Sequence, residues 1–306
     1  MFSVLMSDLN LHTKDSKLTN FADDTQIHIC EENEESLRKV TKQEAESVIT
    51  FFEGVKLSNN PDKAALIYNS KGKGMSTEME IGGKILKSSN DEKLLGLQVS
   101  SDLNWNRHVD KLCVTLKQRM SLLKRIKRKV NNEKMEMIAD AIFQSKLRYG
   151  IAAYGCPKFK FNHLEQTMDP NLGKLQVVQN DMLRILNGKT RSDHTNMQKL
   201  REEIKMMSVN QLSIYHVAIE MFNIINNASS EPLQRKMKIE QRGYQLRSLE
   251  DGKVKVPEKG KKSCQGFGYI GPKLWNYLPG HIRKTTISEI FKDKLKDWIW
   301  EFTPSV

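Results

Sequence analysis

Hydrophobic residues after position 105 recur at steps of three and four, the spacing of one buried face of an α-helix. The stripe consists of Val109, Leu112, Leu116, Met120, Leu123, Ile126 and Val130. Asn131, Asn132 and Glu133 then supply a helix start signal, and the following pattern places Met135, Ile138, Ile142 and Tyr149 on one face. Helical spacing returns over residues 172–187, 196–227 and 286–300, so this part of the chain is predicted to be mainly helical.

The first hundred residues carry strand signals as well as helix signals. An amphipathic helix is predicted over residues 34–57, and it is broken by the Pro-containing stretch that follows. Short strands are predicted at 18–22, 25–29 and 64–68, with a further hairpin inside 79–99 around the Gly82-Gly83 pair. The predicted fold class is therefore α+β.

Composition narrows the range of partners and surroundings. The 306 residues are 38% hydrophobic, which suffices for a core, and the net charge of +12 favours a polyanionic partner or simple solubility. The four cysteines are far apart, so neither a zinc site nor a disulfide framework is predicted, and a reducing, intracellular compartment is the default expectation. No apolar run approaches the roughly 18 residues of a membrane span, so no membrane partner is expected.

A second basic region lies near the C-terminus. Residues 235–284 hold 13 Lys or Arg against 4 Asp or Glu, with seven glycines among them. This composition is typical of chains that pack poorly. We expect an extended basic segment there.

Two adjacent carboxylates stand at the predicted tip of the first hairpin, in the sequence Phe21-Ala22-Asp23-Asp24. Neighbouring ionised carboxylates repel each other, and a divalent cation such as Mg²⁺ is the usual way to keep both charged. Asp is also common in surface turns, where its side chain bonds to the local backbone. The pair therefore predicts either a metal site or an ordinary turn.

The same stretch resembles the aromatic-Ala-Asp-Asp motif of the reverse-transcriptase palm in LINE-type (non-LTR, jockey-like) retrotransposons, and other segments resemble that family in the same order. Residues 2–9 resemble a helix that ends in Asn-Asp-Leu, and 57–63 are similar to an Asn-Pro-x-Lys segment. Residues 93–97 are similar to the Leu-Gly strand of the primer grip, and 103–108 to the Leu-x-Trp-x-x-His start of the thumb. Further downstream, 178–185 and the Leu-Trp-Asn-x-Leu-Pro stretch within 267–283 are similar to the C-terminal part of these proteins.

The resemblance implies a partial polymerase palm at residues 1–100, a helical thumb at 101–190 and a helical, basic C-terminal region at 191–306. It implies that Asp23 and Asp24 are catalytic and hold Mg²⁺, that Lys63 binds the nucleotide, and that Leu95 and Gly96 form the primer grip. The implied partners are an RNA template, a DNA primer and deoxynucleoside triphosphates, and the implied reaction is RNA-directed DNA polymerisation. Read without the family, Lys63 suits a solvated position after a turn and Gly96 suits a bulge in a buried strand.

Two parts of the family pattern have no counterpart in this sequence: a first catalytic aspartate on an upstream palm strand, and a Pro-Gln-Gly segment. Two-metal phosphoryl transfer needs carboxylates from both sides to hold ions about 4 Å apart. We therefore expect a reverse transcriptase truncated before its first catalytic motif and inactive alone. The alternative hypothesis is a non-catalytic nucleic-acid-binding or functionless remnant.

A run of cations without acidic residues coincides with the end of the first predicted thumb helix. It consists of Lys117, Arg119, Lys124, Arg125, Lys127, Arg128 and Lys129. Such a cluster suits a phosphate backbone, although charged runs on helices are often only solvated faces. It also resembles a nuclear-import signal. We predict that these seven residues bind nucleic acid.

Overall fold

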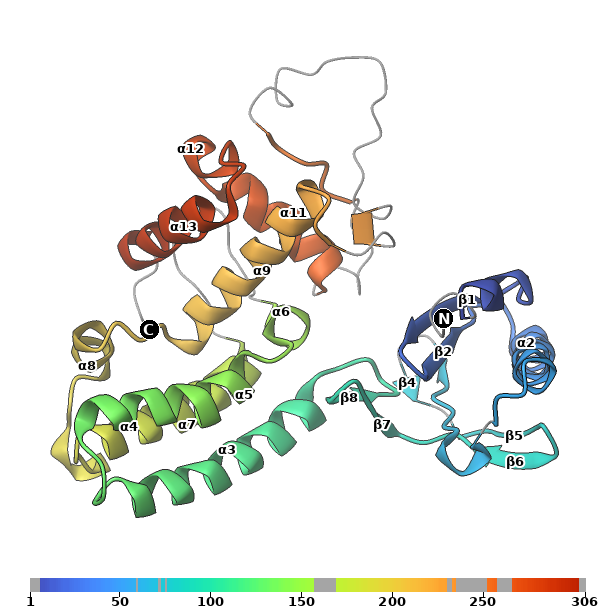
Figure 1. Cartoon of the computed structure of the whole chain (residues 1–306), viewed down its shortest axis with the longest axis horizontal. Helices are drawn as coiled ribbons and strands as arrows, with labels where there is room; N and C mark the ends of the chain where they lie inside the picture. Colours follow the sequence, from blue (N-terminus) through green and yellow to red (C-terminus); the bar gives the residue numbers. More distant parts are fainter. Residues whose placement is uncertain are drawn as a thin grey trace. The chain divides into compact units, whose positions relative to one another are not determined.

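The computed structural model describes residues 6–58, 60–70, 73–74, 76–156, 169–229, 233–234, 252–257 and 266–302. Over these residues the chain mixes helices with small antiparallel sheets, as the α+β prediction requires (Figure 1). The chain divides into two compact units, Met1–Asn104 and Trp105–Val306. Within the described ranges, no helix combines the length and apolar character needed to cross a membrane.

The first unit combines one long helix with short hairpins. Helix α2 spans Glu34–Gly54 and is capped at its N-terminus by Asn33, whose side chain accepts a hydrogen bond from the Ser36 N–H. The 3₁₀ turns are η1 (Asp8–Leu11) and η2 (Pro61–Lys63). Four described hairpins pair β1 (Lys17–Phe21) with β2 (Asp24–His28), β3 (Asn69–Ser70) with β4 (Lys73–Gly74), β5 (Glu78–Ile81) with β6 (Lys84–Lys87), and β7 (Asp91–Leu94) with β8 (Leu97–Ser100).

The predicted strands of this unit are confirmed in part. The hairpin around Gly82-Gly83 forms as β5–β6, and β7–β8 adds a second hairpin in the same stretch. The strand predicted at 64–68 was wrong, because that segment forms only an isolated bridge from Leu66 to Ser88. Without a neighbouring strand to supply more ladder hydrogen bonds, an apolar run does not become a strand.

The β1–β2 hairpin is held against α2 by a small core and by one carboxylate. Leu18 and Ile27, which face each other across the hairpin, pack on a buried cluster that includes Val48 and Phe51 of α2. Glu44, only 3% exposed, accepts hydrogen bonds from the backbone N–H of Lys14 (3.1 Å) and of Asp15 (3.3 Å), and from the Ser16 hydroxyl (2.5 Å). The segment that leads into β1 is therefore fastened to the helix.

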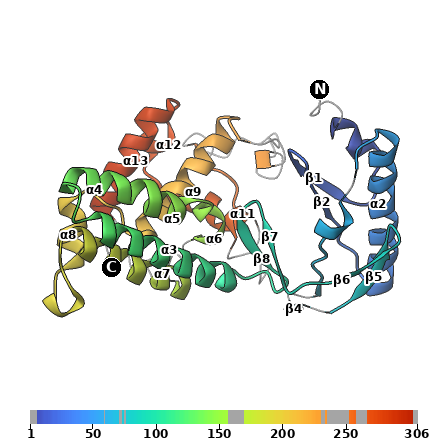
Figure 2. The same ribbon diagram turned by 60° about the horizontal axis from the view of Figure 1, so that its bottom comes forward.

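The described residues of the second unit form helices joined by loops, with no strand among them. Its elements are α3 (Asn106–Ile126), α4 (Asn132–Ala139), a π-helical turn η3 (Asp140–Gln144), α5 (Ser145–Arg148), α6 (Ile151–Tyr154), α7 (Pro170–Leu186), η4 (Arg191–Asp193), α8 (Met197–Glu203), α9 (Val209–Ile225), α11 (Phe267–Tyr277), α12 (Gly280–Arg283) and α13 (Ser288–Phe302). Figures 1 and 2 both place α3 alongside α7, and these two helices are in contact. The predicted apolar stripe of α3 is buried from Val109 to Leu123.

Two helix predictions for this unit needed correction. The helix that begins after Asn131 changes its buried face at the π-turn, so Phe143 and Leu147 are buried, whereas Tyr149 is 51% exposed. A five-residue turn rotates all later side chains relative to a regular α-helix. The single helix predicted over 196–227 is two helices, because Ser208 and Gln211 form a capping box that starts α9.

Buried amide groups connect α7 to its neighbours. Gln179, which is fully buried, donates to the Met207 carbonyl oxygen (3.0 Å) and to Oε1 of Gln144 in the π-turn (3.5 Å). Gln176 donates to Oε1 of Gln179 (2.9 Å) and accepts from the Val209 N–H (2.8 Å). Since each polar group has a partner, the network joins three segments at little desolvation cost.

The C-terminal helices pack around Trp275 and α9. The expectation of an extended, poorly packed segment over 235–284 was wrong for residues 267–284, which form α11 and α12; residues 235–251 and 258–265 lie outside the described part. Trp275 is 1% exposed and its indole N–H donates to the Gly252 carbonyl oxygen (2.8 Å). The Asn276 side chain accepts from the Val254 N–H and donates to the Val254 carbonyl oxygen, both at 2.8 Å. These bonds fasten residues 252–257 to α11.

We predict that Gln179→Ala destabilises the second unit by about 3 kcal/mol, because it leaves several buried partners unsatisfied at about 1–3 kcal/mol each. Tryptophan fluorescence during urea unfolding measures this, since all four tryptophans lie in that unit. Gln118→Ala, on the exposed face of α3, is the matched control and should change stability little. Equal effects of the two substitutions would contradict a structural role for the network.

A second prediction concerns pH and Glu44. Burial alone would raise the pKa of Glu44, but the hydrogen bonds from Ser16, Lys14 and Asp15 outweigh it and lower the pKa below the usual 4.5. The stability that this carboxylate contributes is complete above its unfolded-state pKa and is lost as the pH falls through the lower folded-state value.

The amide NMR signals of Lys14 and Asp15 should therefore titrate with a midpoint below 4.5. Glu44→Gln should abolish that titration, whereas Glu46→Gln, at an exposed pair with Lys42, should not. A midpoint at or above 4.5 would argue against the clamp.

Candidate nucleic-acid interface

The Asp-Asp pair lies at an exposed hairpin tip. Phe21 pairs with Asp24, so Ala22 and Asp23 form a two-residue turn between β1 and β2. Ala22 has a φ of 52°, in the left-handed region that residues other than Gly, Asn and Asp rarely adopt. Both carboxylates are exposed to solvent.

The carboxylates suit Mg²⁺ as oxygen ligands but supply them from one side only. In the part of the chain that the structure describes, no group of three or more His, Cys, Asp or Glu residues is placed to hold a metal ion. A cation at Asp23 and Asp24 would therefore keep most of its water ligands. Magnesium at this tip stays a prediction.

The other predicted palm residues lie on separate turns of the first unit. Lys63 ends η2 and is exposed, next to an ion pair in which Lys84 lies 2.5 Å from Asp62. Leu95 and Gly96 form the two-residue turn between the paired residues Leu94 and Leu97, with φ values of 45° and 82°. Gly96 thus lies in a hairpin turn that requires positive φ, and the bulge in a buried strand was the wrong alternative.

His108, in the segment similar to the start of the thumb, is a packing residue. Its ring lies 6.0 Å from that of Trp105 and 4.7 Å from that of Tyr154, and 6% of the residue is exposed. Burial, with a smaller contribution from Lys146, lowers the pKa of His108 to about 4. The imidazole is therefore neutral at physiological pH.

The seven cations near the end of α3 fall into two groups. Five are exposed: Lys117, Lys124, Arg125, Arg128 and Lys129. Arg119 instead donates to the Ile142 carbonyl oxygen in the π-turn, and Lys127 donates to the Ile185 carbonyl oxygen near the end of α7. Burial also lowers the pKa of Lys127.

Each inward bond goes to a carbonyl oxygen at a helix irregularity or near a helix end. A π-turn displaces the i→i−4 pattern, and the last four carbonyls of a helix have no partner within it. A cation at a helix C-terminus also interacts favourably with the helix dipole. Arg119 and Lys127 therefore have structural partners that no reading of residues 117–129 alone reveals.

Acidic residues on the same helices are already neutralised. Asp110 of α3 lies 2.6 Å from Lys174 of α7, and Asp181 pairs with both Arg184 and Arg191. The hydrogen bonds from Arg191 and Arg184 outweigh burial and lower the pKa of Asp181. The five exposed cations therefore form a positive surface, with a further one, Lys189, that sequence reasoning missed.

Lys189 joins this surface through the end of α7. Gly188 has a left-handed backbone, and a Cβ built there would lie 3.4 Å from the Lys127 ammonium. The next residue, Lys189, is exposed. Because it is about sixty positions from the cluster, no local sequence signal links the two.

Comparisons with protein families, curated proteins and solved structures found no match. The chemistry of the site therefore rests on the residues of this chain. What the arrangement offers is a five-residue cationic surface at α3, extended by Lys189, and a separate pair of exposed carboxylates.

We predict that nucleic acid binds with strong salt dependence. If the five exposed cations neutralise about five phosphates, affinity for duplex should fall roughly 500-fold between 50 and 200 mM salt. Fluorescence anisotropy measures it, and Lys124→Gln with Arg128→Gln should lower the slope by about 0.9 per residue. Lys174→Gln, at a paired position, is the control and should leave the slope unchanged. Unchanged slopes in the double variant would count against this surface.

Proposed function

We propose that residues 1–306 are the C-terminal part of a LINE-type reverse transcriptase and that, by themselves, they bind nucleic acid without polymerising. The observation that carries the proposal is the aromatic-Ala-Asp-Asp sequence at an exposed hairpin tip, with the other family-like segments following in order. The fold class is compatible with a palm remnant followed by a helical thumb.

In the full-length relative, the reaction would be metal-dependent nucleotidyl transfer to a DNA primer on an RNA template. Bound Mg²⁺ would offset charge on the deoxynucleoside triphosphate. Asp23 and Asp24 would hold the metal from one side, and Lys63 would offset charge on the leaving pyrophosphate. The Leu95-Gly96 turn would bring its backbone close to the primer, because Gly has no side chain there.

The second candidate function, a non-catalytic nucleic-acid-binding remnant, is favoured by the five exposed cations in and directly after α3. Phosphoryl transfer needs positioned carboxylates on both sides of the reacting groups, whereas phosphate binding needs only exposed positive charge. The described residues offer more for the second task than for the first.

We predict no primer extension by residues 1–306 with Mg²⁺ or Mn²⁺, because the sequence has no counterpart of the first catalytic aspartate or the Pro-Gln-Gly segment that would help to align the 3′ hydroxyl with the triphosphate. Fusing the fingers and first palm strands of a LINE-type enzyme ahead of Met1 should restore extension. In that chimera, Asp23→Ala should abolish extension and leave nucleic-acid binding nearly intact.

Glu32→Ala, which removes an exposed acid outside the motif, is the control for that chimera and should retain activity. Extension by the unfused chain would contradict the proposal. So would a working chimera that tolerates Asp23→Ala.

A further inference from the structure

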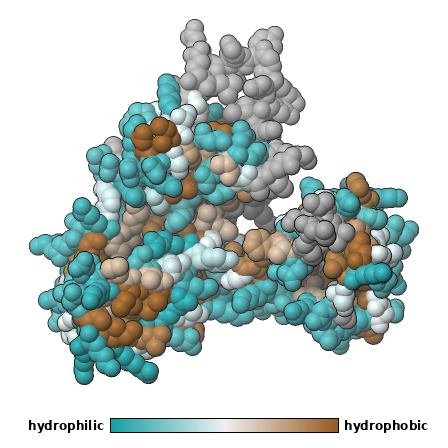
Figure 3. Space-filling view, viewed as in Figure 1, coloured by the Kyte–Doolittle hydropathy of each residue, from teal (hydrophilic) through white to brown (hydrophobic). Residues whose placement is uncertain are grey.

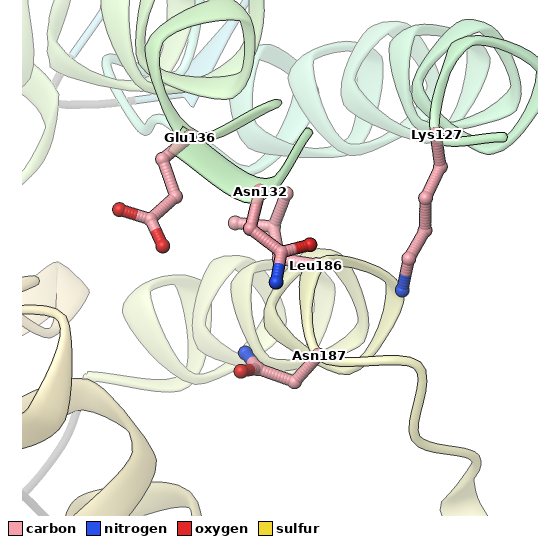
Figure 4. Close-up of a pocket in the computed structure, with 5 residues that line it drawn as sticks. All are labelled: Lys127, Asn132, Glu136, Leu186 and Asn187. Carbon is pink, nitrogen blue, oxygen red and sulfur yellow. The ribbon is translucent and has the colours of Figure 1, made fainter. Parts of the chain in front are cut away.

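A polar cleft of about 190 Å³ lies where the end of α3, the start of α4 and the end of α7 meet (Figure 4). It is lined by Lys127, Asn132, Glu136, Leu186 and Asn187. The bond from Lys127 to the Ile185 carbonyl oxygen spans the two sides and helps to fix their separation. The cleft is smaller than the roughly 300 Å³ of most drug-sized sites, so it would take one planar ring system.

The cleft presents hydrogen-bond acceptors and donors at different places. Figure 4 shows the Glu136 carboxylate at one end, the Lys127 ammonium at the other and the Asn132 amide between them. The Asn187 amide N–H₂ donates to the Leu183 carbonyl oxygen (3.0 Å), so its own carbonyl oxygen keeps acceptor capacity. An occupant should therefore offer adjacent donors beside an acceptor.

Cationic residues closely follow two of the cleft-lining residues in the sequence. Arg128 and Lys129 follow Lys127, Lys189 follows Asn187 by two positions, and all three are exposed. These charges favour a polyanion and disfavour a peptide whose Arg or Lys would otherwise suit Glu136.

We infer that this cleft binds one unpaired guanine of a nucleic-acid strand whose phosphates lie on the flanking cations. The Watson–Crick edge of guanine places two donors, N1–H and N2–H, beside the acceptor O6. Glu136 would accept from both donors, and Asn132 or Lys127 would donate to O6. Adenine, cytosine and uracil each place an acceptor beside their donor. That acceptor would face the Glu136 carboxylate, and the two would repel each other. The inference rests on the proposed nucleic-acid binding and adds a base preference to it.

The test uses uridine oligonucleotides with one central guanosine, inosine, adenosine or cytidine, measured by fluorescence anisotropy with the whole chain. The oligonucleotide with guanosine should bind roughly fivefold to tenfold tighter than those with adenosine or cytidine. This preference is at the low end of the range for a bidentate base contact, because the cleft is open to solvent. Inosine lacks the 2-amino group and should lie between them.

Glu136→Gln should abolish the preference for guanosine without weakening binding of the other oligonucleotides, because it removes an acceptor and a negative charge. Glu133→Gln is the matched control: it removes the same charge from the first turn of α4, outside the cleft lining, and should keep the preference. Circular dichroism of both variants verifies the fold.

Two results would overturn the inference while leaving nucleic-acid binding intact: equal affinity for all four oligonucleotides, or a guanosine preference that survives Glu136→Gln. Failure of every oligonucleotide to bind at low salt would overturn the proposed nucleic-acid binding as well.

Discussion

The buried hydrogen bonds of Gln179 are the constraint on which the second unit depends. They join α7 to the π-turn on one side and to the start of α9 on the other, where the long C-terminal core begins. Because these bonds fix the position of α7, the buried stripe of α3 has a fixed helix to pack against. The opposite face of α3 is exposed to solvent and carries its cations. In Figure 3, hydrophobic atoms also gather on the surface where α3 and α4 lie, and Met137 and Leu122 are among the exposed apolar residues. The exposed cations of α3 and the apolar surface beside them thus both follow from the way α3 packs on α7.

Local patterns predicted several elements correctly, but not the break between α8 and α9, the helices α11 and α12, or how distant residues meet. The stripe of α3, the Asn131 cap and the Gly82-Gly83 hairpin each depend on residues a few positions apart, which a sequence displays directly. The Arg119 side chain bonds to a π-turn twenty-three positions away, and the Lys127 side chain bonds to a helix end fifty-eight positions away. Neither relation has a local signature. The cleft beside Lys127 follows from the same long-range contact, so no sequence pattern could have located it.

The segments that resemble the retrotransposon family have different structural roles. Trp275 fills a core, and both Trp275 and Asn276 bond to the backbone of residues 252–257, so their presence has a structural explanation. His108 packs between aromatic rings, and Gly96 occupies a turn that needs its positive φ. Asp23 and Asp24 are exposed at a strained turn, where neither core packing nor a buried partner explains two adjacent acids. The Asp-Asp pair therefore has no packing role in the first unit, and it suits either a metal site or an ordinary surface turn.

Lysine acetylation footprinting of the whole chain, with and without an oligonucleotide, tests most directly the claim that the α3 surface binds nucleic acid. Mass spectrometry would compare the reactivity of each lysine in the two states. We predict that Lys117, Lys124, Lys129 and Lys189 lose reactivity when the oligonucleotide binds, whereas Lys127, held by the Ile185 carbonyl oxygen, reacts poorly in both states. Protection confined to lysines of α13 or of the first unit, with the α3 lysines unchanged, would contradict it.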